Sequence, residues 1–146
     1  MKMNHMESNE SIIVMSISML IAGIFSGMNA FINSKEDFRI NINDIYMSLM
    51  MIGIMFILMG IYYKSLKLGL FGSIVSIITF ICIRNQVFVY KNEYLTSMIP
   101  HHSMAVMMSK ELLKKKEDLP KDIQQFVKNI INTQESEINF MKKNIQ

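Results

Sequence analysis

Three long apolar runs, at about residues 11–32, 45–63 and 66–89, constrain this chain more than any other feature of its sequence. The first two contain no charged residue, and the third carries Lys67 at its start and Arg84 near its end, where membrane interfaces are expected. A helix rises 1.5 Å per residue, so about 20 residues cross the ~30 Å hydrocarbon core of a bilayer. The sequence therefore predicts three transmembrane helices and a lipid bilayer as the first partner.

The distribution of basic residues predicts an orientation. The short connection between the second and third runs holds Lys64 and Lys67, and Lys2 precedes the first run. The longer connection after the first run holds Lys35 and Arg39 together with acidic residues. Because Lys and Arg favour the cytoplasmic side, we expect an integral, multi-pass protein with the N-terminus inside and the C-terminal region outside the cytoplasm.

Composition excludes several classes of protein. With 146 residues there is room for one compact unit, and a net charge of +3 gives no case for nucleic-acid binding. A single cysteine excludes a disulfide framework and a Cys-based zinc site. No nucleophile with a base, paired acids or nucleotide-binding loop is present, so we do not expect an enzyme. We divide the chain into a polar tail at 1–10, a three-span region at 11–90 and a C-terminal hairpin at 91–146.

The C-terminal region has the period of two helices. Thr96 or Ser97 can cap the first helix, with Pro100 tolerated in its first turn. The lysine run at 114–116 suits a solvated helix end. Asp118 can cap the second helix, and the short connection predicts an antiparallel pair.

Soft ligands gather at the open end of this hairpin. On the first helix a stripe with spacing of three and four contains Met98, His101, Met104 and Met108. On the second helix a stripe contains Gln134, Glu137 and Met141. A chain that folds back near residue 118 places His101 level with about Gln134. The same fold places Met98 level with about Glu137.

These side chains suit Cu(I), which prefers thioether and imidazole ligands, with a carboxylate to orient an imidazole. The competing interpretation is that the methionines fill a hydrophobic core and the histidines are satisfied polar residues. A zinc or di-iron centre fits less well, because the chain lacks a Glu-x-x-His motif. A second methionine ladder, at Met47, Met51, Met55 and Met59, could pass Cu(I) along the second span or simply pack against lipid.

The pattern Met-x-x-His-His, with a Met six residues after the second His and then Gln-x-x-Glu-Ile-x-x-Met, resembles the "domain of unknown function 305" family. Its positions are filled by Met98, His101, His102, Met108, Gln134, Glu137, Ile138 and Met141. Upstream, Tyr46-Met47-Ser48-Leu49-Met50 and Arg84-Asn85-Gln86 resemble a membrane-bound branch with three spans. Met104 and Met107 depart from the usual residues of the family, and the Trp-Leu often found after the last Met is absent.

The resemblance implies an all-α, ferritin-like hairpin after three spans, usually extracytoplasmic, in a family with some copper-binding members. We therefore expect a membrane-anchored protein that binds or sequesters Cu(I) or a similar metal. The expected metal ligands are Met98, His101, His102, Met104, Met108, Glu137 and Met141, with Gln134 supporting them. The alternative is a structural or assembly protein whose hairpin is a docking module without metal, and homo-oligomerisation remains open under both.

Overall fold

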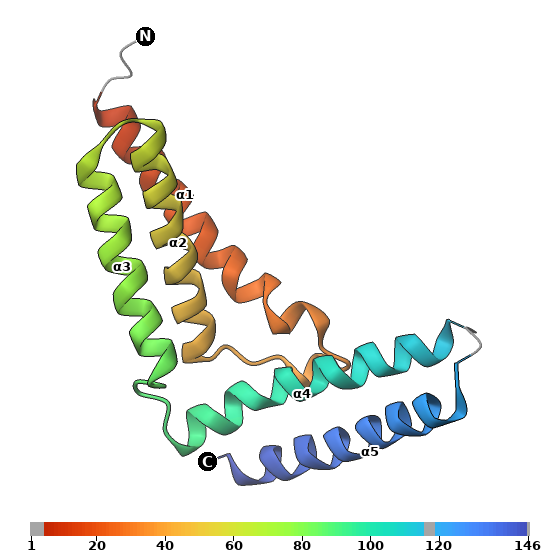
Figure 1. The fold of residues 1–146 in the computed structure, drawn as a ribbon. Helices are drawn as coiled ribbons and strands as arrows, with labels where there is room; N and C mark the ends of the chain where they lie inside the picture. Colours follow the sequence, from red (N-terminus) through yellow and green to blue (C-terminus); the bar gives the residue numbers. More distant parts are fainter. Residues whose placement is uncertain (1–4, 116–118, 146) are drawn as a thin grey trace. The chain divides into compact units, whose positions relative to one another are not determined.

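The computed structural model describes residues 5–115 and 119–145, and none of these residues lies in a strand (Figure 1). The elements in chain order are α1 (His5–Ser26), η1 (Met28–Phe31), η2 (Lys35–Asp37), α2 (Ile42–Tyr62), α3 (Leu66–Arg84), α4 (Lys91–Lys114) and α5 (Lys121–Asn144). The predicted all-α class is therefore confirmed.

The chain divides into two compact units. One, here called the three-helix unit, comprises residues 1–25 and 43–87. The other, here called the hairpin unit, comprises residues 26–42 and 88–146. From the sequence we grouped the connection between the first two spans with the membrane region. In the structure residues 26–42 pack with the hairpin.

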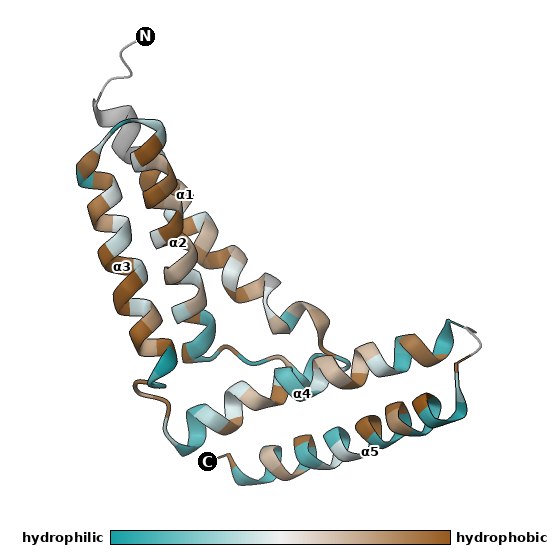
Figure 2. Cartoon of the chain, in the orientation of Figure 1, coloured by the Kyte–Doolittle hydropathy of each residue, from teal (hydrophilic) through white to brown (hydrophobic). Residues whose placement is uncertain are grey.

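The three expected spans lie mainly in the three-helix unit, and the first extends into the hairpin unit at its C-terminal end. Segments Ser11–Phe31, Ile42–Tyr62 and Leu66–Arg84 are long and apolar enough to cross a membrane. Figure 2 shows α2 and α3 coloured mostly as hydrophobic. Only 28% of the apolar window of α2 and 11% of that of α3 is buried in the isolated chain, which is the arrangement expected of helices that face lipid.

Glycines bring α2 and α3 into close contact. A Cβ atom at Gly72 would lie 2.5 Å from the carbonyl oxygen of Gly53 and 2.7 Å from the nitrogen of Ile57. A Cβ atom at Gly60 would lie 2.5 Å from the nitrogen of Gly69. Small residues of this kind allow backbones to approach closely in lipid, where helix association depends on packing.

Both α2 and α3 end in the same backbone motif, with a residue in the left-handed region. After α2, Ser65 N–H bonds to Gly60 O, and Lys64 at φ 51° bonds to Ile61 O. After α3, Val87 N–H bonds to Cys82 O, and Gln86 at φ 47° donates to the carbonyl of residue 83. These paired bonds satisfy the last carbonyls of each helix. Helix α3 therefore ends at Arg84, before the expected end of the span at residue 89.

The hairpin unit is held by contacts between α4 and α5, which run side by side in Figure 1. Its buried core consists of Ile99, Val106, Ile138 and Met141. The partly buried side chains that pack against this core are Leu95, Met98, Ile131 and Ile145. The expected helical hairpin is therefore present.

The hairpin helices begin at other residues than expected. Helix α4 starts at Lys91, and Tyr94 N–H already bonds to Tyr90 O. Pro100 consequently lies inside α4 and not in its first turn, so that prediction was wrong. Its ring is fully buried, and this packing offsets the helical hydrogen bond that proline cannot donate. Helix α5 starts at Lys121 after Pro120, and the expected cap Asp118 lies outside the described residues.

We predict that Gly72→Ala destabilises the three-helix unit by about 2 kcal/mol, because the new methyl group overpacks the contact with α2. The measurement is the thermal unfolding midpoint of the full chain in detergent micelles. Gly69→Ala is the matched control, since no atom lies within 4 Å of a Cβ at that position. Equal midpoints for the two variants would contradict the close contact.

Candidate metal centre

A histidine of α4 and a glutamate of α5 meet across the hairpin. His102 Nδ1 lies 3.0 Å from Glu137 Oε2. The same carboxylate oxygen accepts a hydrogen bond of 3.2 Å from Gln134 Nε2. Gln134, on the same helix as Glu137, thus holds the carboxylate beside the imidazole.

Helical spacing places two methionines beside this pair. Met98 precedes His102 by four residues, and Met141 follows Glu137 by four, so each shares a helix face with its neighbour. In an antiparallel pair with His102 opposite Glu137, Met98 lies level with Met141. Consistently, Met141 is buried in the hairpin core, and Met98 packs against that core. Glu137 was expected level with Met98, and the structure places it one turn further along α4, against His102.

The surroundings of His102 favour its neutral form. Burial lowers the pKa of His102, and the neighbouring His101 lowers it further, while Glu137 acts in the opposite direction. A neutral imidazole is the form that binds a metal ion. His102 Nδ1 is buried and lies close to Glu137 Oε2 without meeting it in hydrogen-bond geometry. If a small rotation of the ring lets Nδ1 donate to Glu137, Nε2 is the nitrogen that could bind a metal ion, as in many metal-ligating histidines.

The other expected ligands lie on a different face of α4. His101 is exposed, with its ring centroid 6.0 Å from that of His102. Met108 is 56% exposed and lines a groove near the far end of the helix with Met107. Met104, which lies between His101 and Met108 in the sequence, is half-buried. The residues expected on one stripe of α4 therefore lie on two faces. Met98 shares its face with His102, four residues later, and not with His101, three residues later.

Within 5–115 and 119–145, no group of three or more His, Cys, Asp or Glu side chains is placed to hold one metal ion. The methionine sulfurs of the hairpin are the other side-chain atoms that could bind a soft ion. Thioethers select soft ions such as Cu(I) over hard ones. The residues that fit such an ion are His102, Met98 and Met141.

A buried carboxylate that the sequence did not single out joins three segments of the hairpin unit. Asp37, in η2, is 4% exposed. Its Oδ2 accepts a hydrogen bond of 2.6 Å from Ser103 Oγ of α4, and its Oδ1 lies 2.6 Å from Lys142 Nζ of α5. Ser103 Oγ also accepts a 2.8 Å hydrogen bond from Asn33 N–H. This network lies next to His102 and Met141 in sequence, so it fixes the two helices at the candidate centre.

The connection that carries Asp37 has its own internal support. Asn29 Nδ2 donates to Arg39 O at 2.8 Å, and Arg39 N–H donates to Asn29 Oδ1 at 3.1 Å. Arg39 Nη1 also donates to Glu36 O at 2.8 Å. Spacing along a helix could not reveal the contacts of Asp37, since Ser103 and Lys142 belong to two other helices. The only signal in the sequence was a cluster of polar residues between the first two apolar runs.

Two comparisons relate this chain to known proteins. The family described as "Domain of unknown function (DUF305)" matches residues 85–145. A relative, "Uncharacterized protein L153" of Acanthamoeba polyphaga mimivirus, is 41% identical over 139 residues. That alignment covers 92% of this chain and 90% of the relative. The chain belongs to the DUF305 family. No solved structure matches the chain.

The DUF305 pattern can now be read on the fold. Its Gln-x-x-Glu segment is the Gln134–Glu137 pair that contacts His102, and its first and last methionines, Met98 and Met141, belong to the packed interior of the hairpin. In the three-helix unit, Tyr46 Oη donates a 2.8 Å hydrogen bond to Val87 O, directly after Arg84-Asn85-Gln86. The first of the two upstream segments that resembled a membrane-bound branch thus contacts the residue that follows the second.

We predict that Asp37→Ala destabilises the hairpin unit by about 3 kcal/mol, because Lys142 and Ser103 lose a shared buried partner. The measurement is limited proteolysis of the full chain in detergent, followed at sites in α5, together with its thermal midpoint. Glu36→Ala is the control, since the neighbouring Glu36 side chain is exposed. Equal protease resistance of the two variants would contradict the role of Asp37.

Proposed function

We propose that this protein is a membrane-anchored binder of a soft metal ion, with Cu(I) as the preferred ion. The observation that supports this most directly is the His102–Glu137 contact beside Met98 and Met141. It combines a neutral imidazole, a carboxylate that orients it and two thioethers on one pair of helix faces. The ion is cargo that the protein sequesters or hands on.

In this proposal each residue has a distinct task. His102 supplies a nitrogen donor, and Met98 and Met141 supply sulfur donors that exclude harder ions. Glu137 holds the imidazole in place, and Gln134 holds Glu137. His101, Met104 and Met108 fall outside this narrower set because they lie on another face of α4.

The test is a Cu(I) titration of the full chain in detergent under reducing conditions, against a competing chelator. We expect one tightly bound ion and a loss of affinity of at least about tenfold in His102→Ala. Glu137→Gln should lower the affinity by roughly 10–100-fold, as is usual for residues that orient a ligand. The full chain is required because Asp37, which joins the hairpin helices, lies outside residues 91–146.

Met108→Leu is the matched control, because Met108 is a methionine of the same helix that lies away from His102. Its affinity should stay within about threefold of wild type. Weak binding that is indifferent to His102→Ala would contradict the proposal, as would equal losses in Met108→Leu and Met141→Leu.

A docking module is the alternative, and one observation favours it. A groove of about 570 Å³ lies at the far end of the hairpin, where Met108 is 56% and Phe126 62% exposed. Exposed apolar surface of this kind often marks a site of protein contact. This alternative requires no metal, so the Cu(I) titration separates it from the first proposal.

We further propose that the hairpin lies outside the cytoplasm, because Lys64 lies on the short connection between α2 and α3 and Lys67 lies in the first turn of α3. An odd number of spans then places the hairpin on the opposite side from the N-terminus.

Membrane-impermeant thiol labelling of intact cells tests this orientation in a Cys82→Ser background. Ser136→Cys, at an exposed position of α5, should be labelled without permeabilisation. Leu66→Cys, 77% exposed beside the α2–α3 connection, should be labelled only after permeabilisation. The reverse pattern would overturn the orientation.

A further inference from the structure

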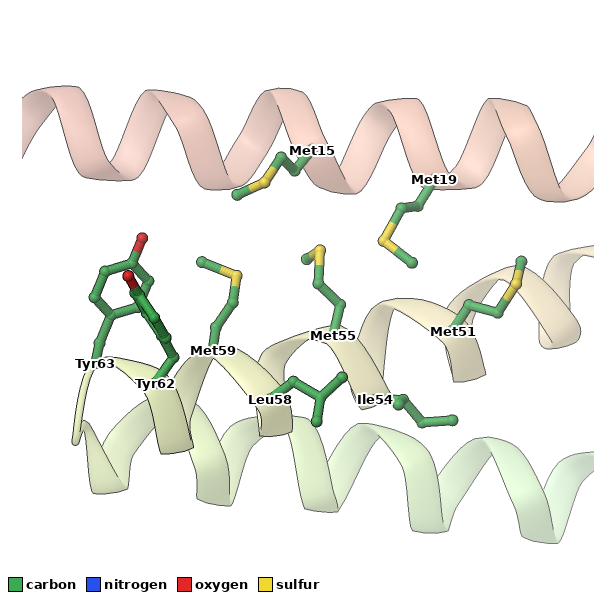
Figure 3. Close-up of a pocket in the computed structure, with 9 residues that line it drawn as sticks. All are labelled: Met15, Met19, Met51, Ile54, Met55, Leu58, Met59, Tyr62 and Tyr63. Atoms are coloured by element: carbon green, nitrogen blue, oxygen red, sulfur yellow. The ribbon is translucent and has the colours of Figure 1, made fainter.

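The largest concentration of sulfur in the described structure lies in the three-helix unit, away from the hairpin ligands. An open pocket of about 610 Å³, here called the α1–α2 cavity, is lined by five methionines of two helices, Met15, Met19, Met51, Met55 and Met59. The other described side chains that line it are Ile54, Leu58, Tyr62 and Tyr63, and none of these is charged. Figure 3 shows Met15 and Met19 extending from α1 toward α2, and Met55 and Met59 extending from α2 toward α1.

The register of α1 against α2 pairs these methionines. A Cβ atom at Gly23 would meet Ser48 Oγ and would lie 2.9 Å from Met51 Cε, so Gly23 faces the turn of α2 that carries both residues. Four residues further along each antiparallel helix, Met19 faces the turn of α2 that ends at Met55. Another four residues bring Met15 to the turn that ends at Met59. The result is a row of thioethers from two facing helices, with successive levels separated by about 6 Å along the helices.

This pairing indicates a ligand with an affinity for sulfur. A lipid chain requires only apolar surface, which isoleucine and leucine would supply equally well. Soft ions such as Cu(I) are bound by thioethers in low coordination number. Thioethers are neutral, so a bound ion keeps its charge, and a monovalent ion costs less to place in an apolar surrounding than a divalent one. The rings of Tyr62 and Tyr63 line the same cavity, and aromatic faces attract cations.

We infer that the α1–α2 cavity is a second metal site, which binds a soft monovalent cation, Cu(I) or its analogue Ag(I), through thioethers contributed by both α1 and α2, with Met19 and Met55 at its centre. Sequence alone showed only the ladder of α2, whose methionines could equally face lipid. The structure adds Met15 and Met19 of α1, whose sulfur atoms line the same cavity from the opposite helix. This site shares no residue with the hairpin and does not rest on the hairpin binding metal.

The test is an Ag(I) titration of the full chain in detergent micelles, with Ag(I) as a probe that is not oxidised. Met19→Leu/Met55→Leu should lower the affinity of one bound ion by at least about tenfold, because leucine keeps the volume and removes the sulfur. The matched control is Met47→Leu/Met50→Leu, two methionines of α2 that do not line the cavity. It should bind Ag(I) within about threefold of wild type.

Both doubles are also measured in a His102→Ala background, which separates this site from the hairpin. We expect the cavity ion to persist in His102→Ala, with sulfur as its only ligand type in X-ray absorption. If Met19→Leu/Met55→Leu binds Ag(I) with the same affinity as the wild-type chain, the inference is overturned, and an acyl chain is the occupant that remains. Equal losses in the control double, or nitrogen in the coordination shell of that ion, would overturn it as well.

Discussion

The buried carboxylate of Asp37 is the constraint on which the hairpin unit depends. An unpaired carboxylate in this position would be costly, so its contacts with Ser103 and Lys142 must form together. Those contacts bind the connection at residues 26–42 to both α4 and α5, and they fix the register of the two helices. That register brings His102 to Glu137 and aligns Met98 with Met141. The candidate centre therefore depends on Asp37, although this residue is not one of the proposed metal ligands.

Two methionine-lined sites follow from the same geometric rule in different surroundings. Side chains four residues apart share a helix face, and antiparallel helices bring two such pairs into register. In the hairpin one pair contains an imidazole and a carboxylate, and it lies in a unit with many charged residues. In the three-helix unit the facing side chains are thioethers, and none of the described side chains that line the cavity is charged. The hairpin site thus combines nitrogen and sulfur, whereas the cavity offers sulfur alone.

The features that sequence predicted correctly are local ones. Run length and the absence of charge revealed α1, α2 and α3, and helical period revealed α4 and α5. The start of α4 and the place of Pro100 were missed, because burial of the ring overrides the usual preference of proline for a first turn. Asp37 was missed since its partners lie far away in sequence. The choice between His101 and His102 as the residue facing α5 depended on tertiary register, which spacings of three and four leave open.

The most direct test of the central claim is the methyl NMR spectrum of the full chain with ¹³C-methyl methionine, assigned by single Met→Leu variants and titrated with Ag(I). The account predicts that the first site to respond in the hairpin unit moves the resonances of Met98 and Met141 together, and that both movements are lost in His102→Ala. Unmoved resonances at Met98 and Met141, with movement at Met104 or Met108 in their place, would contradict it.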